Sequence, residues 1–133
     1  MKRIILILLS ALMVLCLASC GKNNEDTGST YKAESTKDAY GNSAELAITL
    51  GEGGKIVAVD WKEYANGVLK DENYGKDLPQ EQYESAQKAV AGSATYPKAL
   101  LDAQDIEKVQ AVSGATQSYT NFVQLYRKAM ESK

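Results

Sequence analysis

Four adjacent residues near the C-terminal end of the chain combine two hydroxyl groups with a glycine: Ser113, Gly114, Ala115 and Thr116. The stretch before them, residues 109–112, reads Val-Gln-Ala-Val and predicts a short strand. After them, apolar side chains recur at helical spacing at Phe122, Leu125, Tyr126 and Ala129. The four residues are therefore predicted to form a strand-to-helix turn.

This turn has the composition of a phosphate-binding turn. Gly114 allows the backbone to turn sharply or to approach a ligand closely. The first amides of a helix have no partners within it, and they lie at the positive end of the helix dipole. The Thr116 hydroxyl can hydrogen-bond a phosphate or be esterified by one. The alternative interpretation is an ordinary helix start, capped by Ser113, Thr116 or Ser118.

Hydrophobic patterns elsewhere predict the elements that must position this turn. Strands are predicted over residues 31–35, 44–50 and 56–64. Helices are predicted to begin near Asp77 and Pro79, near Thr95 and Pro97, and after the turn, with the last running to about Met130. Together they indicate an α+β fold, a twisted antiparallel sheet with helices packed on one side, as a single domain over residues 30–133.

The apolar faces of these elements predict the core. Six side chains are expected to be buried: Leu46, Ile48, Val57, Val59, Phe122 and Leu125. Trp61, the only tryptophan, is expected to pack in the core rather than to stack on a ligand. Residues 65–78 are predicted to be a polar loop from which Tyr64 and Tyr74 can reach a ligand, although solvent-exposed tyrosines are the more common case.

The N-terminal segment has the features of a secretory signal. A charged start is followed by an apolar run over residues 4–18, which is too short for a comfortable membrane span. The run closes on Leu17-Ala18-Ser19-Cys20, which resembles a bacterial lipobox. This resemblance implies that residues 1–19 are removed, that Cys20 is lipidated, and that residues 20–29 form a flexible tether. A simple signal peptide with a chance cysteine is the alternative.

The composition excludes several functional classes. The chain has no histidine and two cysteines, of which Cys16 leaves with the signal and Cys20 is acylated in this interpretation. Thiolate redox chemistry, Cys/His zinc sites and His-based triads are therefore excluded, and no metal site is expected. Loss of Lys2 and Arg3 leaves 13 basic against 17 acidic residues, a net charge of −4. With no basic stripe, nucleic acid is not an expected partner.

The Ser-Gly-Ala-Thr turn, the opening at residues 30–34 and the strand at residues 54–60 resemble the FMN-binding domain family. Its members include flavin-bearing subunits of sodium-pumping NADH:quinone reductases and Rnf complexes, and FMN-binding bacterial surface lipoproteins. In that family the turn carries FMN, often through a phosphoester to the last hydroxyl, which is Thr116 here. Gln110 stands where covalently flavinylated members usually have an acidic residue. The resemblance thus implies FMN as cofactor and leaves covalent and non-covalent attachment open.

Two functions from different classes follow from this resemblance. The first is an electron-transfer lipoprotein, held by its lipid anchor on the extracytoplasmic face of the cell membrane and carrying FMN. It would work with a redox partner protein, and with a flavin transferase if the bond is covalent, as a carrier without catalytic residues of its own. The second is a flavin-free surface lipoprotein that acts as a binding module on the same fold. Gln110 favours the second, and the intact turn favours the first.

Overall fold

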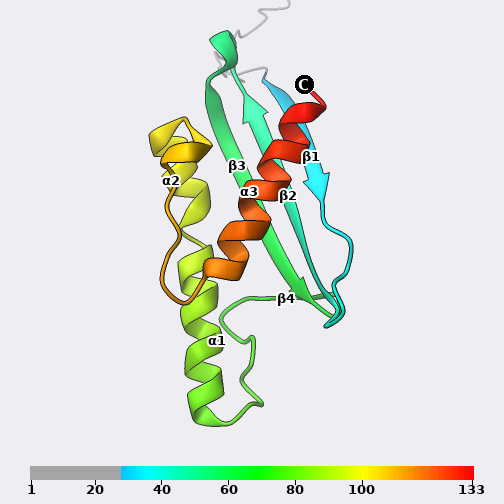
Figure 1. Ribbon diagram of the computed structural model, residues 1–133, viewed down its shortest axis with the longest axis vertical. Helices are drawn as coiled ribbons and strands as arrows, with labels where there is room; N and C mark the ends of the chain where they lie inside the picture. The colour runs from blue at the N-terminus through cyan, green and yellow to red at the C-terminus, as the bar shows by residue number, and fades with distance from the viewer. Residues whose placement is uncertain (1–27) are drawn as a thin grey trace, which may run out of the picture.

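The computed structural model of the protein describes residues 28–133 (Figure 1). The predicted signal peptide (1–19) and the lipidation site Cys20 lie outside the described residues, as does nearly all of the predicted tether (20–29). Within residues 28–133, no helix has the length and the apolar character needed to cross a membrane.

Four antiparallel strands form one sheet in chain order. The strands are β1 (Ser29–Glu34), β2 (Asn42–Leu50), β3 (Ile56–Ala65) and β4 (Val68–Leu69). The helices are α1 (Gln80–Ser93), α2 (Tyr96–Ala103) and α3 (Thr116–Glu131), with short 3-10 helices η1 (Glu52–Gly54) and η2 (Ile106–Lys108). In Figure 1, α3 runs across β1 and β2, α2 lies beside β3, and α1 extends past the end of the sheet. The predicted α+β fold class is confirmed.

The residue pattern of β2 explains why the helices cover only one face of the sheet. Ala44, Leu46 and Ile48 are buried, whereas Glu45 between them is exposed. Successive side chains on a strand point to opposite faces, so the apolar side packs beneath α3 and the polar side faces solvent. The predicted burial of Leu46 and Ile48 is confirmed.

The prediction that Val57 is buried is wrong, because an irregularity interrupts the pairing of β2 with β3. Thr49 pairs with Ala58, but the next residue, Leu50, pairs with Ile56, so Val57 has no partner on β2. A β-bulge of this kind shifts the alternation of side chains by one residue. Ile56 therefore takes the buried position, and Val57 is only half-buried.

Three aromatic rings lie at the centre of the core, between the sheet and the helices. The ring of Phe122 on α3 meets that of Trp61 on β3 edge-on, with 5.2 Å between centroids, and lies 5.6 Å from that of Tyr96 on α2. Phe122 and Leu125 are buried as predicted, whereas Val59 is half-buried. The prediction that Trp61 packs in the core is also confirmed.

The predicted strand over residues 109–112 does not form. This segment runs between η2 and α3 without regular secondary structure and joins no strand of the sheet. Its short apolar run gave the signal of a strand, but tertiary contacts decide its conformation. Tyrosine hydroxyls, rather than a neighbouring strand, take two of its backbone hydrogen bonds.

Part of the predicted polar loop over residues 65–78 instead belongs to the sheet. Val68 and Leu69 form β4, which pairs with the end of β3. The turn between them is Asn66-Gly67, whose φ angles are 51° and 82°. Positive φ at both central residues is typical of a two-residue hairpin, and Asn-Gly is the dipeptide that best adopts it.

Candidate functional site

The predicted Ser-Gly-Ala-Thr turn lies directly before and at the start of α3. Ser113 and Gly114 form the turn, and Gly114 has a φ of 89°, in the left-handed region that favours glycine. The Ala115 N–H donates to the Val112 carbonyl at 2.9 Å and closes it. Ala115 is buried, whereas Ser113, Gly114 and Thr116 are exposed, with Thr116 as the first residue of the helix.

The first turn of α3 has no side-chain cap among the described residues. The hydrogen bond from the Tyr119 N–H to the Ala115 carbonyl, at 3.0 Å, begins the helix. The N–H groups of residues 116–118 therefore have no helical partner, and the positive end of the helix dipole lies beside them. This geometry leaves three N–H groups available at the start of α3 and disagrees with the alternative of an ordinary helix start capped by a side chain.

Tyr96 fixes the shape of the turn from inside the core. Its ring is fully buried, and its hydroxyl accepts a hydrogen bond from the Val112 N–H and donates one to the Ala115 carbonyl, each at 3.0 Å. Burial raises the pKa of this phenol, so it stays protonated and keeps its donor. Sequence analysis did not single out Tyr96, because its hydroxyl reaches partners 16 and 19 residues away.

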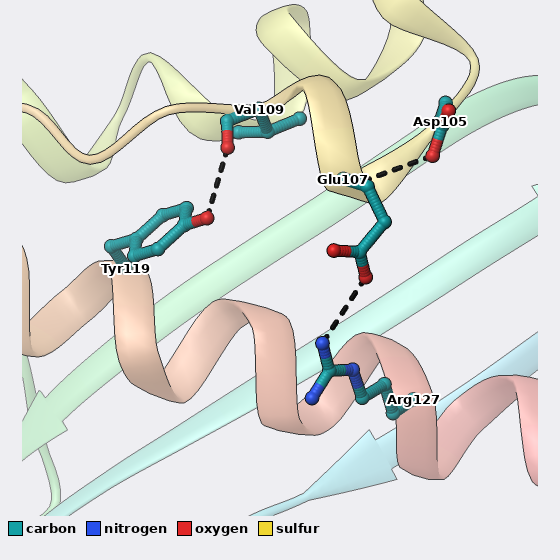
Figure 2. A network of polar contacts seen from close by, with 5 residues as sticks. All are labelled: Asp105, Glu107, Val109, Tyr119 and Arg127. Carbon is teal, nitrogen blue, oxygen red and sulfur yellow. Dashed lines mark hydrogen bonds and ion pairs between the residues drawn. The ribbon is translucent and has the colours of Figure 1, made fainter.

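The segment that leads to the turn is held against α3 (Figure 2). The Tyr119 hydroxyl donates to the Val109 carbonyl at 2.9 Å. About two helical turns further along α3, Arg127 donates to Glu107 at 3.1 Å, and Asp105 accepts from the Glu107 N–H at 3.0 Å. The start of the segment is thus attached to α3 at Glu107 and at Val109.

Two glycines allow α1 to approach the turn closely. A Cβ on Gly92, near the C-terminal end of α1, would come within 2.8 Å of the Ala115 Cβ and 3.2 Å of the Val112 side chain. A Cβ on Gly114 would lie 3.1 Å from three carbons of the Lys88 side chain. The carbon stem of Lys88 therefore covers Gly114, which puts a flexible cation next to the turn.

A cavity of about 450 Å³ opens beside the turn. Its wall comes from the segment before β2 and the start of β2, the end of β3, the loop before α1, α1 itself and the first turns of α3. Gly114 and Ala115 line it, together with Gln117, Ser118 and Asn121 of α3; Ser113 and Thr116 do not. The turn therefore contributes to the cavity through its backbone and its buried residue.

The cavity has one apolar and one polar wall. Ala86, Ala89 and Val90 of α1 form the apolar wall. The polar wall is formed by Glu63 on β3 and by Ser118 and Asn121, which lie one helical turn apart on α3. Such a mixture of apolar surface and a few polar groups is typical of small-molecule sites.

Glu63 is held by a chain of hydrogen bonds that reaches into the core. The Trp61 indole N–H donates to the Ser93 hydroxyl at 2.8 Å, and Ser93 in turn donates to Oε2 of Glu63. Ser93 is buried and Glu63 is half-buried. Because the Ser93 hydroxyl donates a hydrogen bond to one carboxylate oxygen, it orients the Glu63 side chain at the cavity wall.

Two residues of opposite charge, Asp38 and Lys70, also line the cavity. Asp38 accepts hydrogen bonds from the side chain and the N–H of Asn42 and from the Tyr40 N–H, and these bonds lower its pKa. Lys70 places its ammonium 5.4 Å from the centre of the Tyr74 ring. Within the described part of the chain, no cluster of three or more His, Cys, Asp or Glu residues is arranged to hold a metal ion.

The two loop tyrosines named as candidates have different positions. Tyr74 is half-buried and lines the cavity, so it is available to a ligand there. Tyr64 does not line it, and its hydroxyl donates to Glu45 on β2 at 3.0 Å. Gln110, which precedes the turn, is exposed.

Comparison with models of known protein families gives a match that covers most of the domain described above. No curated protein and no solved structure matches the chain significantly. The model of the FMN-binding domain matches residues 39–131, from the segment before β2 to the end of α3. This range includes the turn and every residue that forms the cavity apart from Asp38. The chain therefore belongs to the FMN-binding domain family, which indicates FMN as its cofactor.

Proposed function

We propose that the protein binds FMN with the phosphate at the start of α3 and the ring system in the adjoining cavity. The observation that carries this proposal is the uncapped first turn of α3 beside a cavity of about 450 Å³. Small-molecule sites typically have volumes of roughly 300–1,000 Å³. Gly114 and Ala115 belong both to the turn and to the cavity wall, so a single ligand can occupy both. Bound FMN supplies redox chemistry, while the protein provides binding and orientation.

The residues around the turn fit a phosphate. Three N–H groups, those of residues 116–118, have no helical partner, and the absence of a side chain on Gly114 lets the stem of Lys88 lie against the turn. Lys88 adds a cation, because its stem lies against Gly114 and its ammonium is free to turn toward the phosphate. The Thr116 hydroxyl is exposed at the same point, as esterification by a flavin transferase requires.

Gln110 is the residue that bears on whether FMN is attached covalently or non-covalently. This residue is exposed just before the turn, at a surface that a transferase can reach, and it is neutral where covalently loaded members of the family usually have an acid. We therefore propose binding of FMN with Thr116 either esterified or hydrogen-bonded to the phosphate. A flavin-free binding module on the same fold is the second candidate, and Gln110 is the observation that favours it.

The cellular role that we propose is electron transfer by a membrane-anchored carrier. Two sequence features support the membrane anchor: the apolar N-terminal run and its end at Cys20, which would attach the domain to the extracytoplasmic face through lipid. Membership in the FMN-binding domain family supports electron transfer. A carrier of this type exchanges electrons with a redox partner protein. The domain needs no substrate pocket beyond the one that holds its cofactor.

The visible absorption spectrum and intact mass of the native protein test the cofactor assignment. We expect a flavin spectrum. If the flavin is covalent, the mass exceeds that of the apoprotein by FMN less one water, and Thr116→Ala removes this increment. If it is non-covalent, denaturation releases the colour, and Gln110→Asp raises covalent labelling when a flavin transferase is present. A protein with neither flavin absorption nor measurable affinity for FMN would overturn the proposal in favour of the flavin-free module.

A further inference from the structure

The polar wall of the cavity contains hydrogen-bonding groups that the fold itself leaves unused. Ser118 is 8% exposed, it lines the cavity, and its hydroxyl has no hydrogen-bond partner within residues 28–133. Asn121, one turn further along α3, also lines the cavity with its amide unpaired among the described residues. No fully buried side-chain nitrogen or oxygen within residues 28–133 lacks a partner, so the unpaired atoms of these two residues are accessible and can hydrogen-bond a polar ligand in the cavity.

Glu63 completes the wall with a different chemistry. A carboxylate only accepts hydrogen bonds. Its Oε2 is taken by Ser93, whereas Oε1 has no partner in the part of the chain that the structure describes. The Trp61–Ser93 chain fixes the carboxylate at the cavity. A ligand that matches this wall must therefore offer an N–H or O–H to Glu63 and acceptors to Ser118 and Asn121.

We infer that Glu63 determines ligand specificity by accepting a hydrogen bond from the imide N–H of the isoalloxazine ring, beside carbonyl groups that Ser118 and Asn121 recognise. This inference rests on the proposed function. An imide edge presents one donor between two acceptors, which matches one acceptor residue beside two residues that can donate. The apolar wall formed by Ala86, Ala89 and Val90 suits the faces of a flat ring. Glu63 is a binding residue, and Ser93 and Trp61 are positioning residues that act through it.

Titration of the purified full chain, free of flavin, with FMN and with 3-methyl-FMN tests this inference. The methyl group removes the imide N–H and leaves the phosphate and ribityl chain unchanged. We expect the native chain to bind FMN at least about tenfold more tightly, because a charge-assisted hydrogen bond is lost with the analogue. Glu63→Leu, which has no acceptor, should bind both compounds within about twofold of each other. Glu63→Gln keeps an acceptor and should retain part of the preference.

The control is Glu107→Gln, since Glu107 is exposed and pairs with Arg127 away from the cavity. It should retain the full preference for FMN. Equal binding of FMN and 3-methyl-FMN by the native chain would overturn the inference, point to the ribityl chain as the partner of Glu63, and leave the proposed function standing. A full preference in folded Glu63→Leu would also overturn it. Failure of the native chain to bind either compound would overturn the proposed function as well. If Glu63→Leu does not fold, the affinities of the native chain and of Glu63→Gln for the two compounds still test the inference.

Discussion

Gly114 has a backbone conformation that other residues adopt only with strain. Its φ is 89°, and the stem of Lys88 occupies the space that a side chain would need. Left-handed backbone costs a non-glycine residue about 1–3 kcal/mol. We expect Gly114→Ala to lower the free energy of unfolding by about this amount, and also to weaken FMN binding because the methyl group displaces Lys88 and narrows the approach to the turn.

Gly67 provides a matched control for this substitution. Its φ is 82°, and nothing lies within 4 Å of the position of an added Cβ. Gly67→Ala should therefore cost similar stability by denaturant unfolding and leave FMN affinity unchanged. Equal FMN affinities for the two variants would argue against a role of the turn in phosphate binding.

The buried phenol of Tyr96 is expected to make the protein less stable at alkaline pH. Burial raises the pKa of this phenol above its ordinary value of 10.0, as it does for Tyr126. Folding favours the neutral phenol. Its contribution to the free energy of unfolding is therefore complete below the pKa of the phenol in the unfolded chain, near 10, and is lost as the pH rises through the higher pKa in the folded protein. We expect stability to fall above about pH 10, and the fall to be smaller in Tyr96→Phe. Urea unfolding at pH 8 to 11 measures both slopes, and identical slopes would contradict this assignment.

The irregular pairing of β2 with β3 changes which side chains of β3 are buried. Leu46 on β2 is 2% exposed beneath the helices, whereas Val57 on β3 is half-buried at the bulge. We expect Leu46→Ala to cost about 2–5 kcal/mol of stability, as for other buried leucines. Val57→Ala should cost less than about 1 kcal/mol. Chemical denaturation of both variants compares the two, and a similar cost would mean that the bulge does not determine burial here.

Local patterns in the sequence predict most elements because each pattern belongs to one element. The alternation over residues 44–50 and the apolar spacing after Thr116 led directly to β2 and α3. The bulge is different, because it depends on the pairing of two strands and leaves no sign in either alone. The same reason accounts for residues 109–112, whose apolar run resembles a strand but whose partners are tyrosine hydroxyls from α2 and α3.

At the scale of the whole molecule, the candidate site is an assembly of distant segments. The turn was visible in the sequence because four consecutive residues carry it. The cavity was not, because its wall joins residues from Asp38 to Asn121. Glu63, Ser118 and Asn121 each have an ordinary place in the pattern of their own element. Only the packing of α1 and α3 against one end of the sheet makes them a common wall.

We propose that Cys20 determines the position of this assembly in the cell. A predicted tether over residues 20–29 reaches at most roughly 35 Å when extended, so a lipidated Cys20 would keep the site close to the membrane surface. Each buried methylene of a lipid chain contributes about 0.8 kcal/mol, and two or more chains give stable attachment. We expect Cys20→Ser to leave the signal uncleaved or to release the domain from the membrane fraction. Cys16→Ser, which alters only the predicted signal, should remain processed and attached. Fractionation and intact mass of both variants measure this, and normal processing and retention of Cys20→Ser would exclude the lipid anchor.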